Sequence, residues 1–137
     1  MSLTDYGQPG DPLSAPSLSA WAATVAGQLG YKAQAVTPGT GWTGNVYLYR
    51  SGAVVVCVVL NLAKTAPVAN EVICTFPAGY RPPATQWGSM FTLNVSTGSG
   101  KSELAVSPTG LQAFATPIAS FKHTGQATWV TYDAWPT

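Results

Sequence analysis

Charged residues are scarce in this sequence. Only 8% of its 137 residues are Asp, Glu, Lys or Arg, where about 25% is usual for a soluble domain. The six cations and five anions are scattered, and a nucleic-acid-binding protein normally carries a basic stripe. Hydrophobic residues make up 46%, so the chain has enough apolar side chains for the core of one domain. We therefore expect a surface that meets its neighbours through hydrogen bonds and apolar patches.

Long apolar runs and an N-terminal cationic segment are also missing. The longest apolar run covers residues 53–60, and a membrane-spanning helix needs about 20 residues. No Lys or Arg precedes Lys32, so the start of the chain lacks the cationic region of a secretory signal. We expect a protein that is made in a cytoplasm and is not exported by the usual secretory route.

The sequence has few cysteines and no metal-binding motif. Cys57 and Cys74 form neither a CxxC pair nor a Cys/His cluster with zinc spacing. Both lie in strand-like apolar runs, so we interpret them as buried free thiols. A cross-strand disulfide is the alternative if their strands pair. We predict no metal and no cofactor.

Residues that carry catalysis are equally sparse. The single histidine, His123, has no evident carboxylate to orient it, and we interpret it as a surface residue. The five carboxylates are dispersed, and only Glu71, Glu103 and Asp133 could in principle meet. The sequence contains no GxSxG motif and no phosphate-binding loop. It therefore predicts a protein that is not an enzyme.

The N-terminal part divides into two segments. Residues 1–15 contain Pro9, Gly10 and Pro12 and show no periodicity, so we expect an extended arm. Residues 16–30 predict a short helix that ends at Gly30. This helix is nearly free of charge and too short to be stable alone, so it must pack on its own domain or on copies of itself. Its apolar face contains Leu18, Ala22, Val25 and Leu29.

Residues 31–137 predict a β domain. After an expected loop at 31–41, seven strands are predicted at 45–50, 53–62, 71–76, 85–95, 101–106, 111–116 and 127–132. Turns are expected at Ser51-Gly52 and at residues 107–110. The Val-rich strand at 53–62 predicts a central strand buried on both faces. Short strands at this spacing are typical of an antiparallel sandwich or barrel.

Aromatic residues suggest a different function from catalysis. Trp42 lies between Gly and Thr residues, and Trp87 lies between Gln86 and Gly88. Exposed indole rings beside hydrogen-bonding side chains are a common way to bind sugar rings. The alternative for each Trp is ordinary packing in a small β domain. We take Trp42 and Trp87 as the best exposed candidates for ligand binding.

The most distinctive segment is ICTFPAGYRPPAT at residues 73–85. It resembles the LPxGYRP signature in the C-terminal head domains of bacteriophage tail fibres and baseplate receptor-binding proteins. The hairpin at 49–55 and the segment LAVSPTGLQAF at 104–114 resemble other parts of those heads, so the resemblance covers residues 41–132. The opening of the chain also looks like that of minor tail proteins of actinobacterial phages.

The signature has a physical explanation in its own residues. Pro77 ends a strand because it has no N–H for the sheet, and Gly79 permits a positive φ in the turn. Pro82 and Pro83 stiffen the chain that returns. Arg81 is then placed to donate to carbonyls of the loop or of a neighbouring subunit, with ligand binding as its second possible role.

The resemblance implies a homotrimeric β head on the outside of a virion, assembled after synthesis in a bacterial host. An N-terminal segment would join it to other phage virion proteins, and the head would recognise a host-surface glycan. The apolar face of the predicted helix would form the trimer seam. Because the chain has no long shaft, a capsid decoration protein that stabilises the shell is the alternative. A cellular lectin-like module is a third, weaker interpretation.

Overall fold

The computed structural model describes residues 30–94, 100–114 and 118–137, and within them the chain forms strands and loops but no helix. All strand pairs are antiparallel, so the domain is mainly β, as the sequence predicts. The predicted arm and nearly all of the predicted helix lie outside the described residues. The strands are β1 (Tyr31–Val36), β2 (Thr43–Ser51), β3 (Val54–Ala63), β4 (Val72–Thr75), β5 (Gln86–Asn94), β6 (Lys101–Val106), β7 (Gly110–Ala113) and β8 (His123–Val130).

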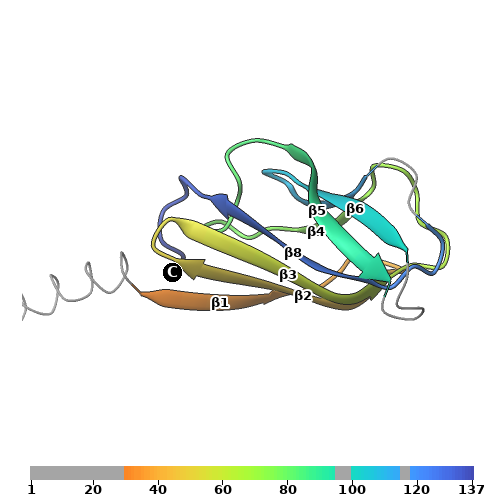
Figure 1. Ribbon diagram of the computed structural model, residues 1–137. Coiled ribbons are helices and arrows are strands. Elements are labelled where there is room, and N and C mark those ends of the chain that lie inside the picture. The colour runs from red at the N-terminus through yellow and green to blue at the C-terminus, as the bar shows by residue number, and fades with distance from the viewer. Residues whose placement is uncertain (1–29, 95–99, 115–117) are drawn as a thin grey trace, which may run out of the picture.

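The eight strands form one sheet that folds over on itself. Their order is β1-β2-β3-β8-β5-β6-β7-β4, so β1 and β4 are the two edges. Figure 1 shows β1, β2, β3 and β8 side by side in one layer, with β5 and β6 in the layer above. Hydrophobic side chains of β2, β3 and β8 share one core with those of β4, β6 and β7. The two layers are therefore halves of a single continuous sheet.

Each predicted strand has a counterpart, and the predicted loop at 31–41 is wrong in part. Residues 31–36 form β1, which pairs with β2 in the register Tyr31↔Ser51 to Val36↔Val46. The Pro38-Gly39 pair, which signals a loop, lies just after the end of this strand. The two predicted turns are present: Gly52 has a φ of 58°, and the N–H of Ser107 donates to Gly110 O at 2.9 Å.

The Val-rich strand β3 is central but is not buried on both faces. It pairs with β2 and β8, and Val55 and Val59 on its inner face are fully buried. Val54, Val56 and Val58 point the other way and are exposed or half-buried. The described chain supplies no second layer on that side. An unbroken run of valines cannot show this difference, because both faces carry the same residue.

The cysteines are free and buried, as predicted. Cys57 lies on β3 and Cys74 on β4, and these strands belong to different layers and do not pair. A disulfide across paired strands is therefore excluded. Burial raises the pKa of both thiols, to about 11 for Cys74. Both thiols are poor nucleophiles in the folded state because the reactive thiolate is suppressed.

The turn after β4 has the structure that its prolines and glycine predict. Gly79 has a φ of 99°, and a Cβ there would lie 2.7 Å from Cβ of Pro136. Glycine is therefore required both by the backbone and by the C-terminal tail packed against it. The Arg81 guanidinium donates from Nε to Phe76 O at 3.3 Å, which confirms its expected bond to a loop carbonyl.

A buried guanidinium joins this turn to the C-terminal tail. Arg50, on β2, is 6% exposed and donates to Gly52 O at 2.8 Å, Gly79 O at 2.5 Å, Ala134 O at 2.9 Å and Asp133 O at 3.0 Å. Its guanidinium also lies 5.2 Å from the ring centre of Trp135. The Asp133 carboxylate completes the link by accepting from the N–H groups of Gly79 and Arg81.

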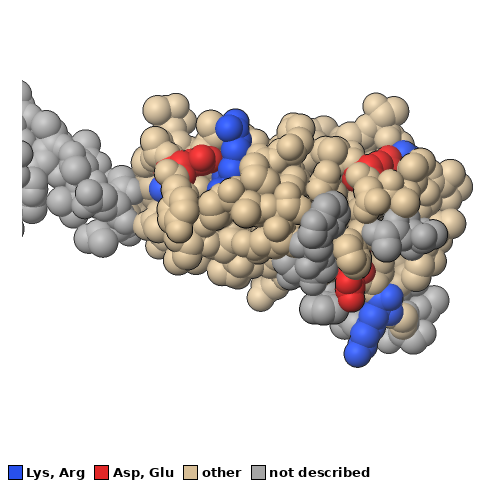
Figure 2. All heavy atoms as spheres, turned by 90° about the horizontal axis from the view of Figure 1, so that it is seen from above, with Lys and Arg blue, Asp and Glu red and all other residues tan. Residues whose placement is uncertain are grey.

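The surface has few charges, as the composition requires. On the face shown in Figure 2, uncharged residues cover most of the molecule, and the acidic and basic groups form small separate spots. Among the described residues one ion pair is present, between Lys64 and Glu71. Ion pairs therefore contribute little to the polar contacts of the described residues.

We predict that Arg50→Gln lowers the free energy of unfolding by about 3 kcal/mol, because several carbonyls buried with the guanidinium lose their donors. The matched change Arg81→Gln removes one long hydrogen bond and should cost less than about 1 kcal/mol. Urea unfolding followed by tryptophan fluorescence measures both values. Equal losses for the two variants would contradict the role given to Arg50.

Candidate functional site

A hollow with polar side chains lies at the end of the domain opposite the start of β1. Strand β1 begins beside the end of β2 and runs toward the loop at 37–42. The hollow lies near this loop, beside the end of β3 and the start of β8. We call it the distal pocket. Its volume is about 210 Å³, and it is lined by Gly41, Thr43, Ala63, Lys64, Thr65, Ser120 and Lys122.

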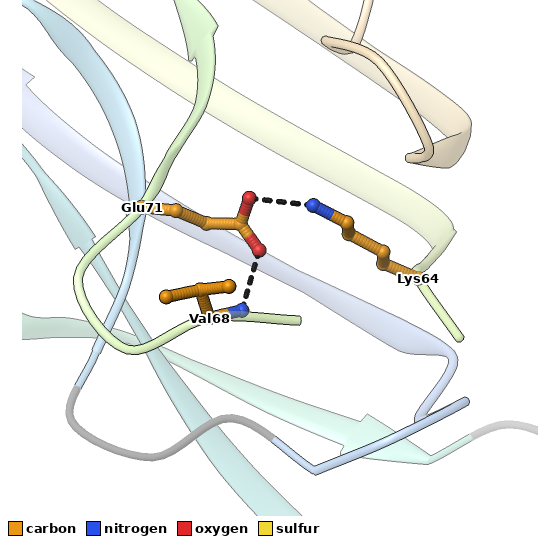
Figure 3. A network of polar contacts seen from close by, with 3 residues as sticks. All are labelled: Lys64, Val68 and Glu71. Atoms are coloured by element: carbon orange, nitrogen blue, oxygen red, sulfur yellow. Dashed lines mark hydrogen bonds and ion pairs between the residues drawn. The ribbon is translucent and has the colours of Figure 1, made fainter. Parts of the chain in front are cut away.

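An ion pair fixes one wall of the distal pocket (Figure 3). The ammonium of Lys64 donates to Glu71 Oε2 at 2.7 Å, and the N–H of Val68 donates to Oε1 at 2.7 Å. Partial burial opposes ionisation of Glu71, but the bonds from Lys64 and Val68 outweigh it and lower the pKa of this carboxyl. Lys64 is therefore held in one position with its charge partly neutralised.

The other wall is tied to the first by the backbone. The N–H of Ser120 donates to Lys64 O at 2.9 Å, and Ser120 itself has a φ of 56°. Gly41 has a φ of 82° and lies so close to Lys64 that a Cβ would come within 3.1 Å of its Cε. The positive φ therefore favours glycine at position 41, and a larger side chain there would have to displace the side chain of Lys64.

Several donors of the pocket remain free. Among the described residues, the Lys122 ammonium and the hydroxyls of Thr65 and Ser120 have no hydrogen-bond partner. Lys122 is exposed and has no carboxylate partner, unlike Lys64. The pocket therefore offers one unpaired positive charge and hydroxyl groups to a small polar molecule with a negative group.

Trp42 lies in the core near this pocket and does not expose its ring. It is 7% exposed, so the expectation of an exposed, sugar-stacking Trp42 is wrong. Its ring centre lies 6.3 Å from that of His123, and Trp42 belongs to the same core cluster as Val46 and Leu48. The neighbouring glycines that suggested exposure instead shape the turn that leads this ring inward.

His123 is also buried, so its interpretation as a surface residue is wrong. It is 1% exposed, and its ring centre lies 4.6 Å from that of Phe121. Its Nδ1 lies 2.7 Å from Thr92 Oγ1, and that hydroxyl donates to Ser102 O at 3.2 Å. Burial lowers the pKa of His123 to about 4, so the ring is neutral near pH 7. The His123 side chain therefore packs in the core and takes part in a buried row of hydrogen bonds with Thr92 and Ser102 O.

The other predicted ligand residues lie elsewhere. Arg81 is exposed near the Arg50 link, at the end where β1 begins, so it does not join Trp42 in one site. Trp87 lies on β5, and its side chain falls outside the described residues. The predicted trimer residues Leu18, Ala22, Val25 and Leu29 also lie outside them.

The pocket residues were missed because they are distant in sequence. Lys64 follows one predicted strand and Lys122 precedes another, and nothing in the sequence shows that β3 pairs with β8. The register Leu62↔His123 brings the two lysines to the same end. The available signal was that polar residues lie just outside the ends of two apolar strands. This signal predicts a shared site only when the strand order is known.

In the described ranges, no group of three or more His, Cys, Asp and Glu side chains is arranged to hold a metal ion. Within the same ranges, no helix has the length and hydrophobicity to span a membrane.

The fold is similar to a known one. The crystal structure of the receptor binding protein gp15 of Listeria phage PSA superposes with a TM-score of 0.52 at 14% sequence identity. The match covers 96% of this chain and 89% of that chain. Family models and curated protein sequences, when searched, give no match. The likeness is therefore one of fold, at a sequence identity too low to transfer a function.

We predict that the buried His123 makes folding sensitive to acid. Between pH 6.5 and pH 4 the unfolded chain binds a proton at this residue that the folded chain does not, so stability falls as the pH is lowered through this range. The loss should be on the order of 2 kcal/mol. Urea unfolding at pH 7, 6, 5 and 4.5 measures it. His123→Gln should flatten the dependence between pH 6.5 and 5, and an unchanged slope in that variant would contradict this origin.

Proposed function

We propose that this protein is a receptor-binding head of the tail-fibre or minor tail type on the surface of a bacteriophage virion. The fold likeness to a phage receptor binding protein over nearly the whole chain carries the proposal. The segment at 73–85, which resembles the signature of such heads, forms the buried turn whose Gly79 and Tyr80 pack against the rest of the domain. The two observations are independent, since one comes from the fold and the other from the sequence.

The two ends of the domain suit different tasks. The predicted arm of residues 1–15 and helix of residues 16–30 lead into β1 at the end that holds the Arg50 link. The arm would attach the protein to other virion proteins. The distal pocket lies at the opposite end, where it would face the host when the arm is bound to the particle.

The distal pocket suits part of a glycan that carries a negative group. Its volume is below the range of about 300–1,000 Å³ that is usual for drug-sized ligands, so it fits a unit of about one sugar ring. The unpaired Lys122 would bind a carboxylate or phosphate, and the hydroxyls of Thr65 and Ser120 would bind sugar hydroxyls. Recognition would then depend on hydrogen bonds rather than on stacking against Trp42.

The remaining parts of the proposal follow from the resemblance to phage heads and from the composition and motifs of the sequence. We propose that the protein is a homotrimer, is not an enzyme, contacts no nucleic acid and needs no cofactor. Its place is the exterior of the virion.

Binding of the purified full-length chain to host cells and to their isolated cell walls tests the function. Lys122→Gln should weaken binding about tenfold, because it removes a charge-assisted hydrogen bond at the pocket. Lys101→Gln is the matched control, since Lys101 is an exposed lysine outside the pocket, and it should bind like the unmodified protein.

Three outcomes contradict parts of the proposal. Unchanged binding by both lysine variants would remove the distal pocket from recognition. Equal losses would indicate only a general attraction to an anionic surface. Failure of the unmodified protein to bind any host material would contradict host recognition and favour a structural role on the particle.

A further inference from the structure

The outward-facing positions of β1, β2, β3 and β8 carry no charged residue. Strand register places three rows of paired side chains on the same side of β1, β2, β3 and β8. We call this surface the outer face. Its rows are Tyr31, Ser51, Val54 and Val130; Ala33, Tyr49, Val56 and Thr128; and Ala35, Tyr47, Val58 and Gln126.

The charged residues of these four strands all point elsewhere. Lys32 and Arg50 pair with each other in register, one position out of step with the outer face. The Lys32 ammonium donates to Pro136 O at 2.8 Å, and Arg50 is buried against the C-terminal tail. The absence of charge from the outer face is therefore specific to one side of the strands.

The outer face is accessible and rich in large side chains. Tyr31 is 67% exposed, Val54 is 44% exposed and Val130 is 51% exposed, and all three belong to one row. The ring of Tyr31 stacks on that of Tyr49 at 6.1 Å, and Tyr49 lies 6.4 Å from Tyr47. Tyrosines among valines, with no charge between them, are the composition of an interface core.

We infer that the outer face is where copies of this chain meet. Identical copies repel each other when their contact surface carries one sign of charge, and this face carries none. The 29 residues before the described part join the domain at Tyr31, on the corner of this face. The predicted seam of Leu18, Ala22, Val25 and Leu29 would therefore continue directly into the contact between the sheets.

This inference deepens the homotrimer of the proposed function and specifies its surface. Three copies with their outer faces toward a common axis would bury the tyrosines and valines. Their N-terminal segments would emerge together at one end, beside Tyr31. Their distal pockets would all lie at the opposite end, so that three pockets would be presented to one surface and could bind it with avidity.

Sedimentation equilibrium of the full-length chain tests the inference. The unmodified protein should have a mass of three chains, each of 14.2 kDa. Val54→Asp places a charge on the outer face and should raise the dissociation constant of the oligomer at least a hundredfold, because the carboxylate loses its water in the contact. Val72→Asp is the matched control: Val72 is 42% exposed, close to the 44% of Val54, and lies on the edge strand β4. It should leave the mass unchanged.

The outcomes separate this inference from the proposed function. Val25→Asp tests the predicted helix by the same measurement of mass. A trimer that survives Val54→Asp but dissociates with Val25→Asp would overturn the role of the outer face. A monomeric unmodified protein would overturn it too and leave the face to another virion protein. Circular dichroism of Val54→Asp should remain that of a folded β domain. An unmodified protein that forms the trimer but binds no host material would contradict the proposed function and leave the interface standing.

Discussion

The guanidinium of Arg50 binds carbonyls that lie 29 and 84 residues away in the chain, in the turn after β4 and in the C-terminal tail. A sheet that folds over on itself has to be closed at its ends, and here one end is closed by donors from a single side chain. Trp129 adds to this link by donating from Nε1 to Tyr80 O at 2.9 Å. Because the tail lies against Gly79, the signature turn, the tail and β2 form one unit, and the orientation of the two layers depends on it.

The opposite end is closed by backbone hydrogen bonds and one ion pair between its loops. The N–H of Gly39 donates to Ile73 O at 2.6 Å and joins the β1–β2 loop to β4. The Lys64–Glu71 pair and the bond from Ser120 to Lys64 hold the remaining loops together. This end is therefore ordered but solvated, which suits a surface that exchanges water for a polar ligand. The division between a rigid buried end and a polar open end follows from where the few charges lie.

Much of the fold follows from the sequence, and the exceptions have physical reasons. Alternation, turn residues and prolines predict seven strands and the turn around Gly79. Strand β1 was missed because YKAQAV has little of the Val and Ile content that marks a strand, and it forms only by pairing with β2. The burial of Trp42 and His123 was missed because ring exposure depends on which strands become neighbours, and local glycines say nothing of that. Prediction of the distal pocket also requires knowing which strands become neighbours.

The scarcity of charge joins these observations. A chain with so few charged side chains is not kept apart from its neighbours by electrostatic repulsion. An uncharged, exposed face therefore favours association. Lys122, the lysine of the distal pocket that has no anionic partner, leaves its charge available to a ligand. Both features support the proposed assembly of this protein on a virion and its proposed contact with the host.

Immunogold electron microscopy of intact particles, with an antibody raised to residues 41–137, tests the central claim most directly. A receptor-binding head of the tail type predicts label at the tail tip or on the fibres. Label spread over the capsid would contradict host recognition and identify a protein that stabilises the shell.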